Sequence, residues 1–163
     1  MAFCFLFACE TQANLSRNKF LTKDDKLSAA LKLKDVQGGF AGFTGVIWTL
    51  HPDGSWDRKR IVGRKTRKPD LAGKLTAKQL QQIADVLAHA QINKLPGRLG
   101  KFRGANPHVV TLGWGKQQCT WTLPPGMPIP KYPDQPFGKL TVENSFVEIA
   151  QTLGKLLKAP EKE

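Results

Sequence analysis

The stretch LKLKDVQGGFAGFTGVIWTL, residues 31–50, decides the fold. Leu31 and Leu33 alternate with lysines, which is the period of a strand with one apolar face. The double glycine at positions 38–39 ends this strand. A second alternation then places three apolar side chains on a common face, namely Val46, Trp48 and Leu50. Residues 31–50 therefore predict two strands with a glycine-rich segment between them.

Two hairpins follow from the turn residues further along the chain. Pro52-Asp53-Gly54 favours a tight turn, because proline presets the first turn dihedral and glycine accepts a positive φ. Residues from Trp56 to about Val62 then return as a strand. A second hairpin has its turn at residues 113–116, and the apolar residues of its two strands are Val110 and Leu112, then Cys119, Trp121 and Leu123.

Two segments have the pattern of amphipathic helices. Thr76-Ala77-Lys78-Gln79 has the form of a capping box, in which the threonine hydroxyl binds the Gln79 amide and the glutamine side chain reaches back. Apolar residues then recur at helical spacing until Pro96-Gly97. The second helix is expected over residues 141–158. The two apolar stripes are Leu80, Ile83, Ala84 and Leu87, and Phe146, Ile149, Ala150, Leu153, Leu156 and Leu157.

The order of these elements predicts an α+β fold. The connections between strands are short, so the sheet is expected to be mainly antiparallel, with about five strands covered on one face by two helices. Six prolines between positions 124 and 136 exclude a helix or a central strand there, so this segment is expected to cross the surface in an extended form.

Four segments make up the predicted domain organisation. Residues 31–158 form one domain, residues 10–30 a polar linker, and residues 159–163 a short tail. Residues 1–9 are apolar and end in Leu6-Phe7-Ala8-Cys9, which has the form of a bacterial lipobox. They are interpreted either as the remnant of an export signal, with Cys9 lipidated in a bacterial lipoprotein, or as a short apolar tail on a cytoplasmic protein.

The residue types needed for catalysis or metal binding are not arranged for either role. The histidines at positions 51, 89 and 108 have no carboxylate or second histidine at ligand spacing, and three cysteines without a C-x-x-C spacing indicate no zinc site. No serine lies in a nucleophile elbow, and the acidic residues are scattered. We therefore predict a binding protein that is not an enzyme and has no cofactor, no metal and no evident small-molecule substrate.

Charge suggests one possible binding surface. The chain carries 25 basic and 13 acidic residues, with a formal net charge of +12. Such a surface attracts nucleic acid, other polyanions or anionic membranes. The densest group of cations is expected in a loop that ends near Pro69, and it comprises Arg58, Lys59, Arg60, Arg64, Lys65, Arg67 and Lys68. A solvated basic face is the alternative interpretation.

The glycine-rich segment suggests a second binding surface. Its glycines leave the main chain accessible to another chain, and its two phenylalanines are suited to anchoring in a pocket. The alternative is a turn whose phenylalanines fold back into the core. The predicted partner-binding residues are Gly38, Gly39, Phe40, Ala41, Gly42 and Phe43.

The pattern between Leu31 and Leu123 resembles the emfourins, which are small bacterial protein inhibitors of thermolysin-like metalloproteases such as protealysin. The resemblance lies in a strand running into Gly-Gly-Phe-Ala-Gly, the helix start Leu75-Thr76-Ala77-Lys78-Gln79-Leu80, Leu95-Pro96 and a late hairpin. It implies an α/β domain of cystatin-like fold that blocks the active-site cleft of a metalloprotease. The chain is separately expected to be a monomer. Only residues 38–42 match as a motif. The polar arm, the basic loop and the proline-rich segment with its helix depart from the family.

Overall fold

The computed structural model describes residues 19–131 and 141–158. The apolar terminus with Cys9, the first part of the predicted linker and the predicted tail lie outside the described residues. Within them, the predicted α+β class is confirmed, because one sheet packs against helices.

The sheet has seven strands instead of the expected five or so. Their order across the sheet is β4-β3-β2-β1-β6-β7-β5, and every neighbouring pair is antiparallel except β5 and β7. The central strand β1 pairs with β2 on one side and with the much later strand β6 on the other. The strands are β1 Leu31–Gly39, β2 Gly42–Leu50, β3 Ser55–Gly63, β4 Lys65–Lys74, β5 Arg98–Leu99, β6 His108–Trp114 and β7 Gln117–Leu123.

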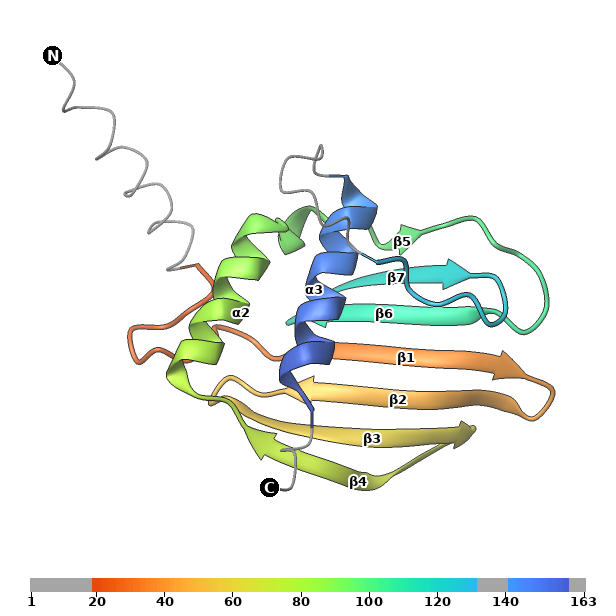
Figure 1. The fold of residues 1–163 in the computed structure, drawn as a ribbon, viewed down its shortest axis with the longest axis horizontal. Helices are drawn as coiled ribbons and strands as arrows, with labels where there is room; N and C mark the ends of the chain where they lie inside the picture. Colours follow the sequence, from red (N-terminus) through yellow and green to blue (C-terminus); the bar gives the residue numbers. More distant parts are fainter. Residues whose placement is uncertain (1–18, 132–140, 159–163) are drawn as a thin grey trace, which may run out of the picture.

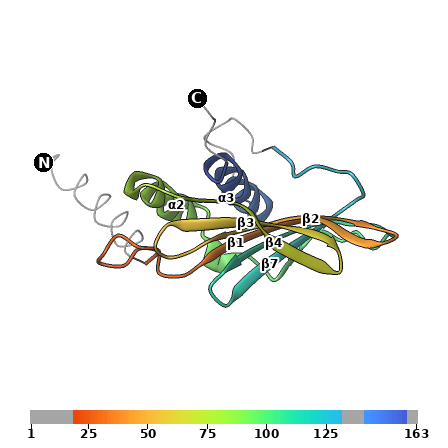
Figure 2. The same cartoon turned by 90° about the horizontal axis from the view of Figure 1, so that it is seen from below.

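Both helices lie on the same face of the sheet, as Figure 1 and Figure 2 show from two directions. They are α2, Ala77–His89, and α3, Val142–Leu156, and a short 3₁₀ turn, Ile92–Lys94, follows α2. The predicted capping box is confirmed. The Gln79 amide donates to Thr76 Oγ1 at 3.3 Å, and the Thr76 amide donates to Gln79 Oε1 at 2.9 Å.

The hydrophobic core lies between the helices and the covered face of the sheet. Phe146 of α3 is completely buried and meets the Trp121 ring of β7 edge-on, with the ring centroids 5.5 Å apart. Leu80, Ile83, Ala84 and Leu87, the predicted apolar stripe of α2, are all buried.

The folded domain begins earlier than residue 31. Phe20 and Leu27 are buried in the core, and the Leu27 amide donates to the Pro52 carbonyl at 2.9 Å. The Phe20 ring packs against Trp114, with centroids 5.6 Å apart. Residues 19–30 therefore belong to the domain, not to a linker. Trp114 itself is the last residue of β6 and not part of the turn predicted at residues 113–116.

The prediction that the basic residues lie in a loop is wrong. These residues form strands β3 and β4, with a turn only at Arg64. Strand β4 lies at the edge of the sheet and is exposed along most of its length. Lysine and arginine are common on such edges, where their charge discourages pairing with other chains. A strand exposed on both faces has no apolar alternation, so the usual sequence pattern was missing.

Candidate functional site

The glycine-rich segment forms the turn of the β1–β2 hairpin. Gly39 pairs with Gly42, which leaves Phe40 and Ala41 as a two-residue turn. Gly42 has a φ of +105°, in the left-handed region that favours glycine. The Phe40 side chain is fully exposed, at 109% of its reference area. The hairpin therefore presents a large apolar side chain at its tip, and the alternative in which Phe40 folds into the core is excluded.

Phe43 is placed differently from Phe40. It is 40% exposed, and the Lys34 ammonium lies 5.8 Å from the centre of its ring, in a cation–π contact across the sheet surface. Two residues further along β2, a side chain at Gly45 would collide with the main chain of Asp35 on β1. Close strand packing and the Phe43 contact therefore support the hairpin just behind its tip.

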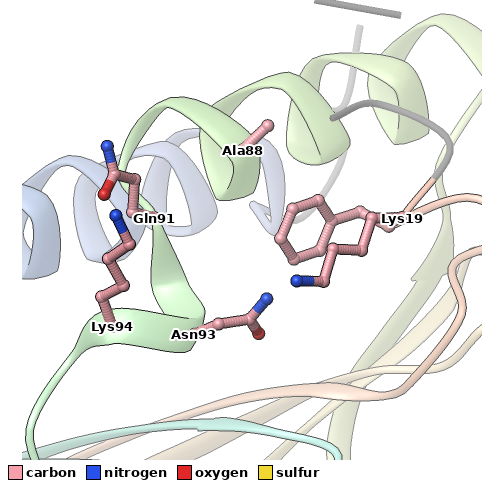
Figure 3. A pocket seen from close by; sticks show the side chains of 6 residues that line it. Lys19, Ala88, Gln91, Asn93 and Lys94 are labelled. Atoms are coloured by element: carbon pink, nitrogen blue, oxygen red, sulfur yellow. The ribbon is translucent and has the colours of Figure 1, made fainter. Parts of the chain in front are cut away.

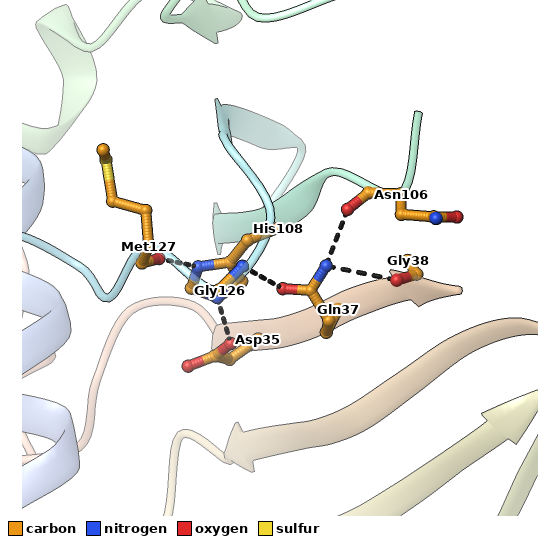
Figure 4. A network of polar contacts seen from close by, with 7 residues as sticks. All are labelled: Asp35, Gln37, Gly38, Asn106, His108, Gly126 and Met127. Atoms are coloured by element: carbon orange, nitrogen blue, oxygen red, sulfur yellow. Dashed lines mark hydrogen bonds and ion pairs between the residues drawn. The ribbon is translucent and has the colours of Figure 1, made fainter. Parts of the chain in front are cut away.

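The Gln37 side chain connects three segments at the base of the hairpin (Figure 4). Its Nε2 donates to the Asn106 carbonyl at 2.6 Å and to the Gly38 carbonyl at 3.1 Å. Its Oε1 accepts from the Gly126 amide at 3.0 Å. One amide side chain thus binds the hairpin to two loops that are distant in sequence.

His108, at the start of β6, adds a second set of contacts to the same region (Figure 4). Its Nε2 lies 2.6 Å from Asp35 Oδ1, and its Nδ1 lies 2.5 Å from the Met127 carbonyl oxygen. The His108 ring therefore bridges the Asp35 carboxylate of β1 and the main chain at Met127. The Gly38 amide also donates to the Pro107 carbonyl at 2.7 Å. Together these bonds fix the base from which the tip projects.

Four segments come together around the tip, and we call them the loop end: residues 38–43, 62–65, 100–107 and 124–131. Phe43 pairs with Gly63 in the next hairpin, and residues 100–107 and 124–131 are bound through Asn106, Pro107 and Gly126. In Figure 1 the β1–β2 tip and the β5–β6 loop project toward the right side of the sheet. Four of the five exposed large apolar side chains of the described residues lie in the loop end: Phe40, Phe43, Val62 and Met127.

The predicted anion-binding residues do not form one patch. Arg58 makes two bonds to Asp70, with Nε 3.0 Å from Oδ1 and Nη2 2.8 Å from Oδ2, while Arg60 Nε lies 2.7 Å from Oδ2. Lys59 is directed to the opposite face and pairs with Asp57 at 3.4 Å. Irregular pairing of β3 with β4 accompanies this arrangement. Arg64 and Lys65 lie in the loop end, and Arg67 and Lys68 on the edge strand.

The Asp70 contacts couple β4 to β3 in a pH-dependent way. Hydrogen bonds from Arg58, and secondly from Arg60, hold the pKa of the Asp70 carboxyl well below its usual range. A lowered folded-state pKa stabilises the fold above the unfolded pKa, which is about 4, and this contribution is lost as the pH falls below that value.

We therefore predict that acid weakens the native chain more than the Asp70→Asn variant. The free energy of unfolding is measured by urea denaturation at several pH values from about 7 to about 2. Below about pH 4 the native value should fall more steeply than the value of the variant, which has no carboxyl group to titrate at this position. Equal slopes for the two proteins would contradict the prediction.

The three histidines each contact a carboxylate that sequence spacing did not indicate. His51 lies 3.2 Å from Asp57, His89 lies 3.0 Å from Glu148, and His108 contacts Asp35. These are pairs, and no group of three or more histidine, cysteine, aspartate or glutamate side chains within residues 19–131 and 141–158 is placed to hold a metal ion. Cys119 is buried, and burial raises the pKa of its thiol to about 11, so it is a poor nucleophile.

A hollow of about 290 Å³ lies away from the loop end, between the N-terminal segment and the end of α2 (Figure 3). Among the described residues that line it there is no carboxylate, histidine, serine or cysteine side chain. The residues around it are Lys19, Phe20, Ala88, Gln91, Asn93 and Lys94.

Within the described part of the chain, neither helix has the length and apolar character needed to cross a bilayer.

Comparison with protein-family models and with curated proteins gives no match to the chain. The resemblance to the emfourins therefore stays a prediction based on residues 31–123.

Proposed function

We propose that this protein is a non-catalytic inhibitor that inserts the β1–β2 hairpin tip into the active-site cleft of a thermolysin-like metalloprotease. The observation that supports this function is the full exposure of Phe40 at the end of a braced hairpin. Phe40 is accompanied in the loop end by the exposed side chains of Phe43, Val62 and Met127, and a group of exposed apolar side chains is typical of a contact surface. The metalloprotease class comes from the emfourin resemblance.

The tip has the chemistry that blocking an extended substrate cleft requires. Phe40 supplies one apolar anchor, and the glycines on both sides of the Phe40-Ala41 turn carry no side chains that would keep the tip away from the cleft. The bonds from Gln37 and His108 hold the base of the tip before any partner binds. A preorganised loop loses less conformational entropy on binding, and this favours tight inhibition without any catalytic group.

The test is a titration of the purified chain into several thermolysin-like metalloproteases. We expect proportional loss of peptidase activity at inhibitor concentrations of about 1 µM or below, which corresponds to a binding free energy of about −8 kcal/mol. A serine protease is the matched control and should keep its activity. Mass spectrometry after incubation should find the chain intact, since a competing substrate would be cleaved near Phe40. Full activity of every metalloprotease tested would refute the proposal.

A further inference from the structure

The loop end combines its exposed apolar side chains with cations from two neighbouring segments. Arg64 forms the β3–β4 turn and Lys65 begins β4, while Lys101 and Arg103 lie in the loop before β6. All four are exposed, and none forms an ion pair with another described residue. The contrast with Arg58, Arg60 and Lys59 is clear, since carboxylates of the same sheet already bind those three.

Carboxylates are missing from the loop end. The four segments that form it contain no aspartate or glutamate in their sequence. The nearest negative charge bound into its base is Asp35, and that carboxylate is occupied by His108 at 2.6 Å. Among the described residues, the four segments around the tip therefore carry basic side chains and no acidic ones.

We infer that the whole loop end is one contact surface, and that it fits a protein whose apolar cleft is bordered by carboxylates. This inference rests on the proposed function and adds the charge of the target. Phe40 and its apolar neighbours would occupy the cleft, while Arg64, Lys65, Lys101 and Arg103 face the acidic border. Such cations at an interface rim mainly raise the association rate, because they steer the encounter before contact.

The observations favour a protein over a nucleic acid or another polyanion. The exposed cations come from the β3–β4 turn and the β5–β6 loop, which lie on either side of the apolar β1–β2 tip. A phosphate backbone, in contrast, is bound along a track of charges. The most exposed apolar group is the uncharged phenyl ring of Phe40, while the ring of Phe43 is 40% exposed and lies against Lys34. An apolar pocket with an acidic border accommodates both the exposed phenyl ring of Phe40 and the cations around it.

The experiment compares two variants that lose the same charge. The rim variant carries Arg64→Gln, Lys65→Gln, Lys101→Gln and Arg103→Gln. The control variant carries Lys78→Gln, Lys116→Gln, Lys155→Gln and Lys158→Gln, at exposed positions outside the loop end. Association and dissociation rates are measured with metalloproteases chosen for acidic or basic cleft borders, over a series of salt concentrations.

We expect the rim variant to associate about tenfold or more slowly with the acidic-border proteases at low salt, with a flatter salt dependence and a nearly unchanged dissociation rate. The control variant should associate at the native rate. Inhibition that is equally fast for both variants would overturn the inference and leave the proposed function intact. If the native chain inhibits none of the proteases, the proposed function fails and the inference fails with it.

A parallel measurement of retention on heparin and on anionic vesicles distinguishes a polyanion or a membrane from a protein as the partner of the loop end. If the rim variant loses retention on either and keeps its association rate with the proteases, the loop end is a polyanion or membrane surface, and the inference is wrong. Far-ultraviolet circular dichroism and urea denaturation of both variants check that the fold is preserved. The mutated side chains are exposed, so little change in stability is expected.

Discussion

Phe40→Ala should strongly weaken the binding of the chain to its target and leave its stability unchanged. A single aromatic anchor at the centre of an interface commonly contributes about 2–4 kcal/mol, so the inhibition constant should rise by about 30-fold to 1,000-fold. The fold does not depend on this side chain, because Phe40 is fully exposed and buries no apolar area. The change in the free energy of unfolding should stay within about 0.5 kcal/mol.

The matched control for this substitution is Val142→Ala. Val142 is 39% exposed at the start of α3, outside the loop end, so this change also removes exposed apolar surface. The control should keep the native inhibition constant. Phe40→Leu should retain part of the affinity, since the leucine side chain still enters an apolar pocket. Unchanged inhibition by Phe40→Ala would show that the tip does not contact the protease.

Phe146→Ala should lower the stability of the fold and leave the inhibition constant of the folded molecules unchanged. The completely buried Phe146 side chain joins α3 to Trp121 of β7, and its truncation leaves a cavity beneath the helix. Such substitutions cost about 3–5 kcal/mol, a large share of the stability of a domain of this size. Urea denaturation should show the loss as a lower midpoint. The measured loss in the free energy of unfolding tests whether the contact between Phe146 and Trp121 holds α3 against the sheet.

The fraction of Phe146→Ala that remains folded should bind with the native constant, because α3 contributes no residue to the loop end. Affinity is therefore determined per folded molecule, at low temperature and low denaturant concentration. A variant as stable as the native chain would contradict the packing described for α3. A folded variant with much weaker inhibition would mean that the binding surface extends beyond the loop end.

Elements with one apolar face were predictable from sequence. The alternation at Val46, Trp48 and Leu50 lies in β2, and the capping box at Thr76 begins α2 as predicted. Strand β4 was not predicted because both of its faces are largely polar and exposed. Phe20 and Leu27 were missed because each is an isolated apolar residue in a polar stretch, and only tertiary packing makes them part of the core.

The candidate site was predictable only in its most local part. The glycines around Phe40 indicated an accessible turn, but an apolar side chain in a turn can equally fold inward, so its exposure required the structure. The brace formed by Gln37 and His108 joins residues that are far apart in sequence, such as His108 and Asp35. No periodicity or spacing signals such bonds. Sequence spacing also did not indicate which basic residues form ion pairs. Arg58, Lys59 and Arg60 do so in the structure.

The pairing of β1 with β6 has a consequence for how the protein becomes active. Gln37 pairs with His108, so the central strand is complete only after most of the chain has been synthesised and a long loop has closed. Pairings between distant segments slow folding. The brace at the base of the tip therefore forms only once β6 and the loop before it have reached β1. We expect nascent or truncated chains that end before residue 108 to be inert, which would confine inhibition to fully folded molecules.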